Sequence, residues 1–253
     1  MQITPNVRII SINSQYGYLF NFYTLLPDRT QALRQFEWLN TTLQKANEAD
    51  EKVIILAHIP MGRWDMLIWW SEMYHQIVSL YAEIIVGQFT GHTHGDSFEV
   101  MRDFQTDSTP VNTIYIAPSV TTFWDINPSF RIYELDRVSW QVKNYIQYHM
   151  NITRANEEGK PTWEIYYDAL SNYDIPDCSP QSWQSVSDRL RTDSKFASMY
   201  QNTQFTGRFG MQPCNDLCRL TRYYALVMGI FIRTSHCETS SATFAQYNKC
   251  LGV

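Results

Sequence analysis

Apolar and polar residues follow two different periods along the first third of the chain. Short β-branched, apolar runs predict buried strands at residues 7–13, 52–60 and 83–90. Between these runs, apolar residues recur every three or four positions at 28–47 and 70–81, which predicts amphipathic helices, with Asp28 as the cap of the first. Strand and helix therefore alternate, and this order is typical of an α/β layer structure.

The pattern changes after Gly95 and again after about Asn151. Four β-rich runs predict a second sheet packed on the first, with strands at residues 97–104, 111–118, 130–136 and 139–150. Beyond them the spacing predicts helices at 162–173 and 179–202, the latter with Ser179 as N-cap and Pro180 in its first turn. We therefore predict a domain of residues 1–150 and a helical domain of residues 151–253.

Composition indicates a globular protein. Of 253 residues, 44% are hydrophobic and 15% aromatic, enough for a sizeable core. A net charge of −5 without clustered Lys and Arg argues against a nucleic-acid partner. The apolar run at 223–232 is about half of what a membrane-spanning helix needs, so no transmembrane span is predicted. Residues 1–17 show no signal peptide, although other features suggest export, so we expect the true amino terminus to lie upstream.

The features that suggest export are cysteines and glycosylation acceptors. All the cysteines lie in the last third of the chain: Cys178, Cys214, Cys218, Cys237 and Cys250. Counting does not decide which of them pair, although their clustering favours short local bridges. Asn-x-Thr tripeptides occur at Asn40 and Asn151, and they are glycosylated only if the chain enters the secretory route.

Three of the six histidines follow predicted strands. His58 ends one strand, and His92 and His94 follow the next in the sequence "TGHTH". Ligands collect beyond the carboxyl ends of strands in open α/β sheets, and imidazole is a good ligand for zinc and related ions. We therefore predict that these histidines hold a metal, with Gly91 supplying a backbone conformation closed to other residues. The remaining histidines are expected to be structural: His75, His149 and His236.

Several motifs resemble one known family. "HIPMG", "GHTHGDSFEV", "IAPSVTTFWDINPSFRIYELD" and "NITRAN" occur in the order and approximate spacing of acid sphingomyelinase and the acid-sphingomyelinase-like phosphodiesterases, which are calcineurin-like metallophosphoesterases. The resemblance extends from about residue 7 to at least residue 237. "GHTH" alone indicates only the superfamily, whereas "PSVTT" with "NPSFR" is more specific to this branch.

The resemblance implies a fold, a metal site and a compartment. It implies part of a two-sheet metallophosphoesterase sandwich flanked by helices, followed by a small helical, disulfide-containing C-terminal domain. Two metal ions, usually zinc, would activate water for phosphodiester hydrolysis, with His58 and His92 on one ion and His94 on the other. It also implies a secreted or lysosomal protein glycosylated at Asn151. It implies a Cys214–Cys218 disulfide. The family's partner position for Cys237 is a tyrosine near "RYY" here, so we expect Cys237 to pair with Cys250, which leaves Cys178 over.

The chain departs from the family in its early motifs. The Asp-x-His, Gly-Asp and Gly-Asn-His-Glu motifs, which carry the bridging carboxylate and the general acid, are absent, so no catalytic acid or base is assigned in this chain. We therefore predict at most one weakly bound zinc ion, little hydrolysis, and apolar segments such as residues 53–59 without a packing layer. The alternative is a catalytically inactive fragment or binding protein that keeps the fold remnant.

The resemblance leaves the substrate open between a sphingomyelin-like lipid and a nucleotide-type small molecule. Three tryptophans follow His58: Trp64, Trp69 and Trp70. They could contact a lipid tail, a nucleobase or a membrane surface, and in the last case the protein would bind a membrane peripherally. The alternative is that they pack against the helical domain.

Overall fold

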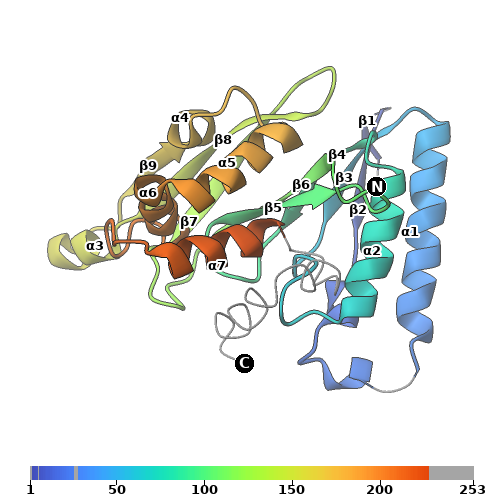
Figure 1. Cartoon of the computed structure of the whole chain (residues 1–253), viewed down its shortest axis with the longest axis horizontal. Coiled ribbons are helices and arrows are strands. Elements are labelled where there is room, and N and C mark those ends of the chain that lie inside the picture. The colour runs from blue at the N-terminus through green and yellow to red at the C-terminus, as the bar shows by residue number, and fades with distance from the viewer. Residues whose placement is uncertain (1, 5, 26–27, 228–253) are drawn as a thin grey trace.

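The computed structural model describes residues 2–4, 6–25 and 28–227. Two β-sheets occupy its centre and helices lie on the outer sides (Figure 1). The predicted α/β class, with two sheets, flanking helices and a disulfide-containing helical region at the carboxyl end, is confirmed. Within the described part, no helix is both long and apolar enough to span a membrane.

The larger sheet has the strand order β1-β2-β3-β4-β6-β5. Its strands are β1 (Gln2–Thr4), β2 (Val7–Ser11), β3 (Lys52–Leu56), β4 (Ile85–Thr90), β5 (Ser97–Arg102) and β6 (Pro110–Ile116). Strands β2, β3, β4 and β6 are parallel, and β1 and β5 pair antiparallel at the two edges. Because β3 and β4 are parallel neighbours, the residues that follow them meet at the same rim.

Two helices cover one face of the larger sheet: α1 (Thr30–Glu48) and α2 (Ile68–Leu80). Short 3-10 turns, η1 (Ser14–Gly17) and η2 (Phe22–Leu25), precede them. The N-cap of α1 is Arg29, not Asp28 as predicted; Asp28 lies one residue earlier and accepts a hydrogen bond from the backbone N–H of Thr30 at 2.8 Å. The apolar stripe of α1 and the aromatic face of α2 pack on β3, with Phe36, Leu39 and Trp70 buried in one cluster.

The prediction that residues 53–59 would lack a packing layer is wrong. Val53 and Ile55 lie under α1 and α2, and each is at most 1% exposed. Ile54 points to the other face of the sheet, where it is buried beside Val86 and next to Leu135 of the second sheet. Alternation along β3 therefore buries Val53, Ile54 and Ile55 under covering layers on both faces, and only Leu56 at its end is exposed.

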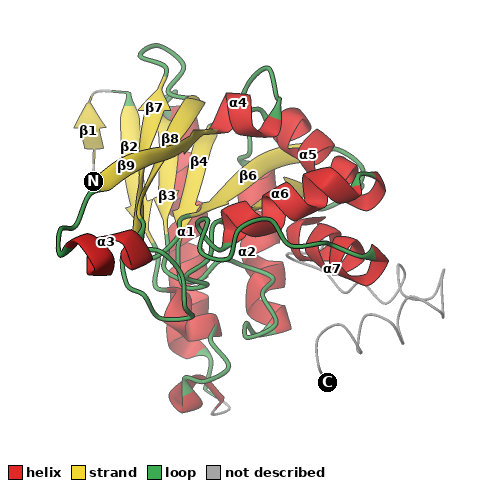
Figure 2. Cartoon of the chain, turned by 90° about the vertical axis from the view of Figure 1, so that its left-hand side faces the viewer, coloured by secondary structure: helices red, strands yellow, loops and turns green. Residues whose placement is uncertain are grey.

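The second sheet is antiparallel and lies against the larger one (Figure 2). It contains β7 (Ser129–Leu135), β8 (Val142–Met150) and β9 (Trp163–Asp168). The prediction that residues 97–104 and 111–118 belong to this sheet is wrong, because they form β5 and β6, which pair with each other and with β4 in the larger sheet. Phe98 and Tyr115 of the larger sheet share a buried cluster with Tyr145 of β8 and Trp183. This cluster joins the two sheets and the C-terminal helices into one core.

The prediction of a helix at residues 162–173 is wrong in its first half. The segment forms β9 and then a short helix, α4 (Ala169–Tyr173). Because β9 pairs with β8, packing against a neighbouring strand overrides the local pattern. The domain boundary at residue 150 stays a prediction. Strand β9, which follows this boundary in the sequence, pairs with β8, which precedes it.

The carboxyl-terminal region is helical. Its helices are α3 (Ile152–Glu158), α5 (Pro180–Thr192), α6 (Ser194–Gln204) and α7 (Asp216–Val227). Ser179 caps α5 as predicted, by accepting a hydrogen bond from the backbone N–H of Ser182. The single helix expected at 179–202 is two helices, because Asp193 caps a new one and accepts from two of its backbone N–H groups.

The disulfide predictions are partly tested. Cys214 and Cys218 form the predicted disulfide at the start of α7, and Cys178 is a buried free thiol. Burial raises the pKa of this thiol to about 12. Cys237 and Cys250, together with His236, lie outside the described residues.

Candidate metal-binding site

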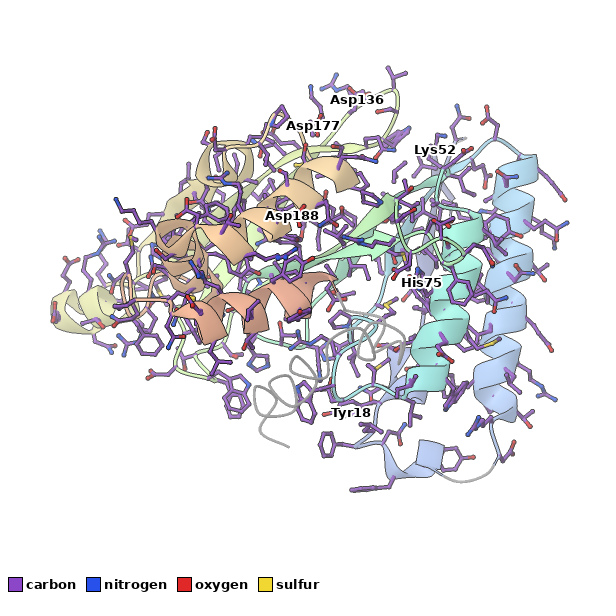
Figure 3. All side chains as sticks on the ribbon, in the orientation of Figure 1. Tyr18, Lys52, His75, Asp136, Asp177 and Asp188 are labelled. Carbon is purple, nitrogen blue, oxygen red and sulfur yellow. A yellow bond between two sulfur atoms is a disulfide. The ribbon has the colours of Figure 1, made fainter. Side chains whose placement is uncertain are left out.

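The three predicted metal ligands lie in two neighbouring loops. His58 follows β3, and His92 and His94 follow β4. The backbone N–H of Gly91 donates to the carbonyl of His58 at 3.0 Å, which ties the two loops together. In Figure 3, Lys52, the first residue of β3, lies near the top of the right-hand half, and Tyr18, whose ring contacts His92, lies near its bottom. The histidines therefore gather at the carboxyl rim of the sheet.

Both histidines of the "GHTH" turn have a left-handed backbone. The φ angle is 69° at His92 and 61° at His94. Such residues cost on the order of 1–3 kcal/mol each and cluster at functional sites. The role predicted for Gly91 is wrong, because its φ is not positive and an added Cβ would meet no atom within 4 Å. The histidines themselves, rather than the glycine, make the reversal after β4.

His58 and His92 face each other. Nε2 of His58 and Nδ1 of His92 are 3.4 Å apart, and the ring centroids are 5.2 Å apart. Two nitrogens bound to one tetrahedral zinc ion at about 2.0–2.1 Å would be roughly 3.4 Å apart. The pair therefore fits two positions of a single zinc ion.

His94 has a different environment. Its ring packs edge-on against Phe123, with 5.5 Å between centroids. Its Nδ1 is buried and has no hydrogen-bond partner in the described structure. Among the residues described, no group of three or more His, Cys, Asp or Glu side chains is arranged to hold a metal ion. The structure thus brings His58 and His92 together and leaves His94 outside that pair.

The two rings have different surroundings. Partial burial of His58, together with the neighbouring His92 and His94, lowers its pKa below the ordinary value for histidine. Nε2 of His92 is 2.7 Å from Oδ2 of Asp65, a carboxylate in the loop between β3 and α2. A neutral imidazole can donate one lone pair to a cation, so the lowered pKa of His58 suits metal binding.

Sequence reasoning missed two carboxylates behind the pair. Asp65 lies seven residues after His58 in "MGRWDMLIWW", and Glu99 lies on β5, five residues after His94. Glu99 is 1% exposed, and neither of its carboxylate oxygens has a hydrogen-bond partner in the described residues. Burial raises the pKa of Glu99 to about 8; Asp65 adds to this and Arg63 opposes it. The sequence signal that could have identified Glu99 is a glutamate inside a run that predicts a buried strand.

A buried ion pair fixes the end of the histidine turn. Asp96 is two residues after His94, and it forms an ion pair with Arg131 of β7, whose side chain is fully buried. The guanidinium also lies over the ring of Tyr145, 3.8 Å from its centroid, and Tyr167 donates its hydroxyl to Asp96. The histidine turn is thus anchored to the second sheet.

The tryptophans after His58 do not act as a group. Trp64 is 62% exposed at the rim, edge-on to Phe20. Trp69 and Trp70 pack against Phe36 of α1, and Trp70 is fully buried. The alternative, that they pack against the C-terminal helical domain, is wrong for these two residues, because their partner is α1. Trp64 alone of the three is exposed at the rim.

The other predicted residues lie apart from the rim. His75 and His149 are buried, and each forms a hydrogen bond with a backbone carbonyl, of Arg102 and Thr206 respectively. Asn40 and Asn151 are partly exposed; Oδ1 of Asn151 caps α3, and Oδ1 of Asn40 accepts from Tyr81. Their glycosylation stays a prediction.

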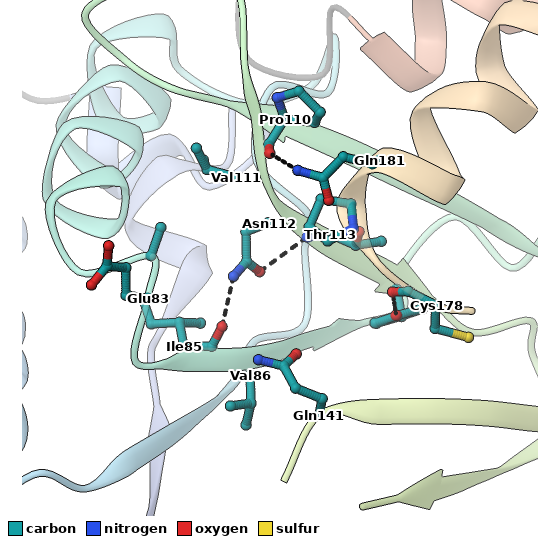
Figure 4. A pocket seen from close by; sticks show the side chains of 13 residues that line it. Glu83, Ile85, Val86, Pro110, Val111, Asn112, Thr113, Gln141, Cys178 and Gln181 are labelled. Carbon is teal, nitrogen blue, oxygen red and sulfur yellow. Dashed lines mark hydrogen bonds between the residues drawn. The ribbon is translucent and has the colours of Figure 1, made fainter. Parts of the chain in front are cut away.

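A pocket of about 220 Å³ lies at the opposite end of the strands (Figure 4). It is lined by residues at the amino ends of β4 and β6, including Ile85 and Pro110, and by Gln141, Cys178 and Gln181. None of the predicted metal ligands lines it. The pocket is therefore separate from the histidine rim.

Comparisons with known proteins agree with the motifs. Residues 109–240 match the profile of the acid sphingomyelin phosphodiesterase C-terminal region. The chain is 35% identical to sphingomyelin phosphodiesterase A of Dictyostelium discoideum over 99% of its own length and 41% of that protein. It is 36% identical to human sphingomyelin phosphodiesterase, over 85% of the chain and 34% of the relative. A human cyclic GMP-AMP phosphodiesterase is 33% identical, over 88% and 51% respectively. The chain thus spans between a third and about half of the length of these relatives.

Proposed function

The chain belongs to the family of the acid sphingomyelin phosphodiesterase C-terminal region, and we propose that it takes part in metal-dependent hydrolysis of phosphodiesters. The observation that carries this proposal is the 3.4 Å approach of His58 Nε2 to His92 Nδ1 at the rim of the larger sheet. Relatives named as phosphodiesterases support the reaction type. Because the chain spans about half of these relatives or less, the activity of the whole protein is itself part of the proposal.

In this proposal the histidines of this chain bind metal ions and orient them. His58 and His92 would each give one imidazole lone pair to a zinc ion, and the partnerless Nδ1 of His94 leaves that histidine available to a second ion in a longer protein. A bound cation would polarise a phosphoryl oxygen and lower the pKa of a bound water. Two imidazoles are fewer than the three protein ligands common at catalytic zinc sites, so this chain should bind one ion weakly.

The substrate would be a small or lipid phosphodiester. The relatives are named for sphingomyelin and for cyclic GMP-AMP, and both contain phosphodiester bonds. Exposed Trp64 and Phe20 lie beside the histidines and would give an apolar substrate or a membrane surface a place to contact. The Cys214–Cys218 disulfide supports passage through an oxidising compartment, where Asn40 and Asn151 would be glycosylated on the way to the lysosome or the cell exterior.

Hydrolysis of bis(4-nitrophenyl) phosphate with added zinc tests the proposal. The wild-type chain should release nitrophenol slowly but faster than zinc alone, and a chelator should abolish the excess. The rate of nitrophenol release by His92→Ala should equal the rate with zinc alone. His149→Gln is the matched control, because this histidine is buried elsewhere against Tyr166 and Thr206. A wild-type chain that binds zinc but never exceeds the zinc rate would contradict hydrolysis and support the inactive binding protein.

A further inference from the structure

Asp65 is held in place although its loop borders an exposed tryptophan. The residue is 6% exposed, and its backbone carbonyl accepts a hydrogen bond from the N–H of Leu19 at 2.9 Å. The next residue, Met66, is buried in the core and bridges to Tyr18. The backbone of Asp65 is thus anchored, by its own carbonyl and by the core side chain of Met66, whereas Oδ1 of the carboxylate is buried without a hydrogen-bond partner among the described residues.

The contact between Asp65 and His92 selects one form of the ring. Oδ2 of Asp65 lies 2.7 Å from Nε2 of His92, and the side chains are 8% and 18% exposed. An ionised carboxylate can only accept, so the imidazole hydrogen belongs on Nε2. The lone pair of the neutral ring then lies on Nδ1, which is the atom that faces His58 at 3.4 Å.

The ring of His92 projects from an unusual backbone conformation. Its φ of 69° is unusual for a residue with a side chain, and the ring is packed on one side by Tyr18, 5.3 Å away. Metal-binding histidines commonly donate their second ring N–H to a carboxylate, which sets both the tautomer and the orientation. The Asp65 contact supplies this constraint.

We propose that Asp65 is a positioning residue for the metal site, which holds His92 in its Nε2–H form and aims Nδ1 at the space shared with His58. The proposal rests on the proposed function, in which these two histidines bind a cation. Asp65 itself is not assigned as a ligand. Its carboxylate acts through His92, and its effect should therefore appear before any metal is added.

The first test is the tautomer of His92 in the metal-free wild-type chain, measured by long-range proton–nitrogen NMR and assigned with His92→Ala. The Nε2–H form should predominate, and predominance of the Nδ1–H form would overturn the proposal. In Asp65→Asn the preference should weaken, since an amide can accept from or donate to the ring. This measurement on the wild type needs no substitution at Asp65, so it decides the question even if the variant fails to fold.

The second test is zinc affinity, measured by competition with a chromogenic chelator. Asp65→Asn should bind zinc about 10- to 100-fold more weakly than the wild type. Glu164→Gln is the matched control, because this carboxylate lies 3.4 Å from a different histidine, His149, and should leave the affinity unchanged. Equal affinities of wild type and Asp65→Asn would overturn the proposal. If the wild type binds no zinc at all, the proposed function fails, whereas the tautomer measurement still decides the role of Asp65.

Discussion

Replacing Glu99 with glutamine should remove a pH-dependent loss of stability. Glu99 is buried on β5 without a hydrogen-bond partner among the described residues, and burial raises its pKa from 4.5 to about 8. Between these two values the folded chain keeps a proton that the unfolded chain has released. The stabilisation from this proton is complete below about pH 4.5 and is lost as pH rises towards 8.

The size of the effect follows from the linkage between proton binding and folding. Each pH unit inside this window lowers the free energy of unfolding by about 1.4 kcal/mol. From pH 5.5 to 7.5 the wild type should therefore lose about 3 kcal/mol more than Glu99→Gln, whose amide does not titrate. Subtracting the free energy of unfolding of one protein from that of the other removes the contribution of other groups that titrate in the same range, including His58.

Urea unfolding followed by tryptophan fluorescence at pH 5.5, 6.5 and 7.5, with a chelator present, gives this difference. Asp136→Asn is the control: hydrogen bonds from the backbone N–H groups of Ser139 and Val138 lower the pKa of Asp136, so this carboxylate is ionised in both states throughout. The control difference should be constant with pH. A constant difference for Glu99→Gln as well would show that the carboxyl is solvated or paired, and would refute the reasoning.

Three other outcomes are expected. Arg131→Leu should lower the free energy of unfolding by about 3–5 kcal/mol, because Asp96 would be left as a buried unpaired charge; urea unfolding measures this, and a loss under 1 kcal/mol would contradict it. Replacing both Cys214 and Cys218 with serine should cost about 2 kcal/mol, since their loop is short, and an unchanged unfolding midpoint would argue against the disulfide. Asn151→Gln expressed in secretory cells should lose one glycan by mass spectrometry, unless this acceptor is never used.

The alternation of apolar residues was enough to predict the strands and helices of the first half, because each has a strong period and its own covering layer. It failed at β9, where Trp163 and Tyr167 resemble a helical pattern but the neighbouring strand β8 decides the structure. Long-range pairing of this kind leaves no local signal. The break at Asp193 was visible as a capping residue and was overlooked inside a long apolar pattern.

Part of the candidate site could be predicted for a different reason. Parallel strands bring their carboxyl ends to one rim, so the positions of His58 and His92 after two such strands were sufficient to expect their meeting. The left-handed backbone of the two histidines was not predicted, because the adjacent Gly91 is the residue type that adopts such a conformation most readily, and the conformation was assigned to it. Asp65 was missed because its contact with His92 depends on how an irregular loop folds back, through Leu19 and Met66, onto the rim.

The most direct test of the metal site is a crystal structure of the zinc-soaked chain with anomalous data collected at the zinc edge. A peak about 2.0–2.1 Å from both Nε2 of His58 and Nδ1 of His92, with Asp65 still bonded to Nε2 of His92, is the predicted result. A fully occupied peak elsewhere on the molecule, with none between these two rings, would contradict it.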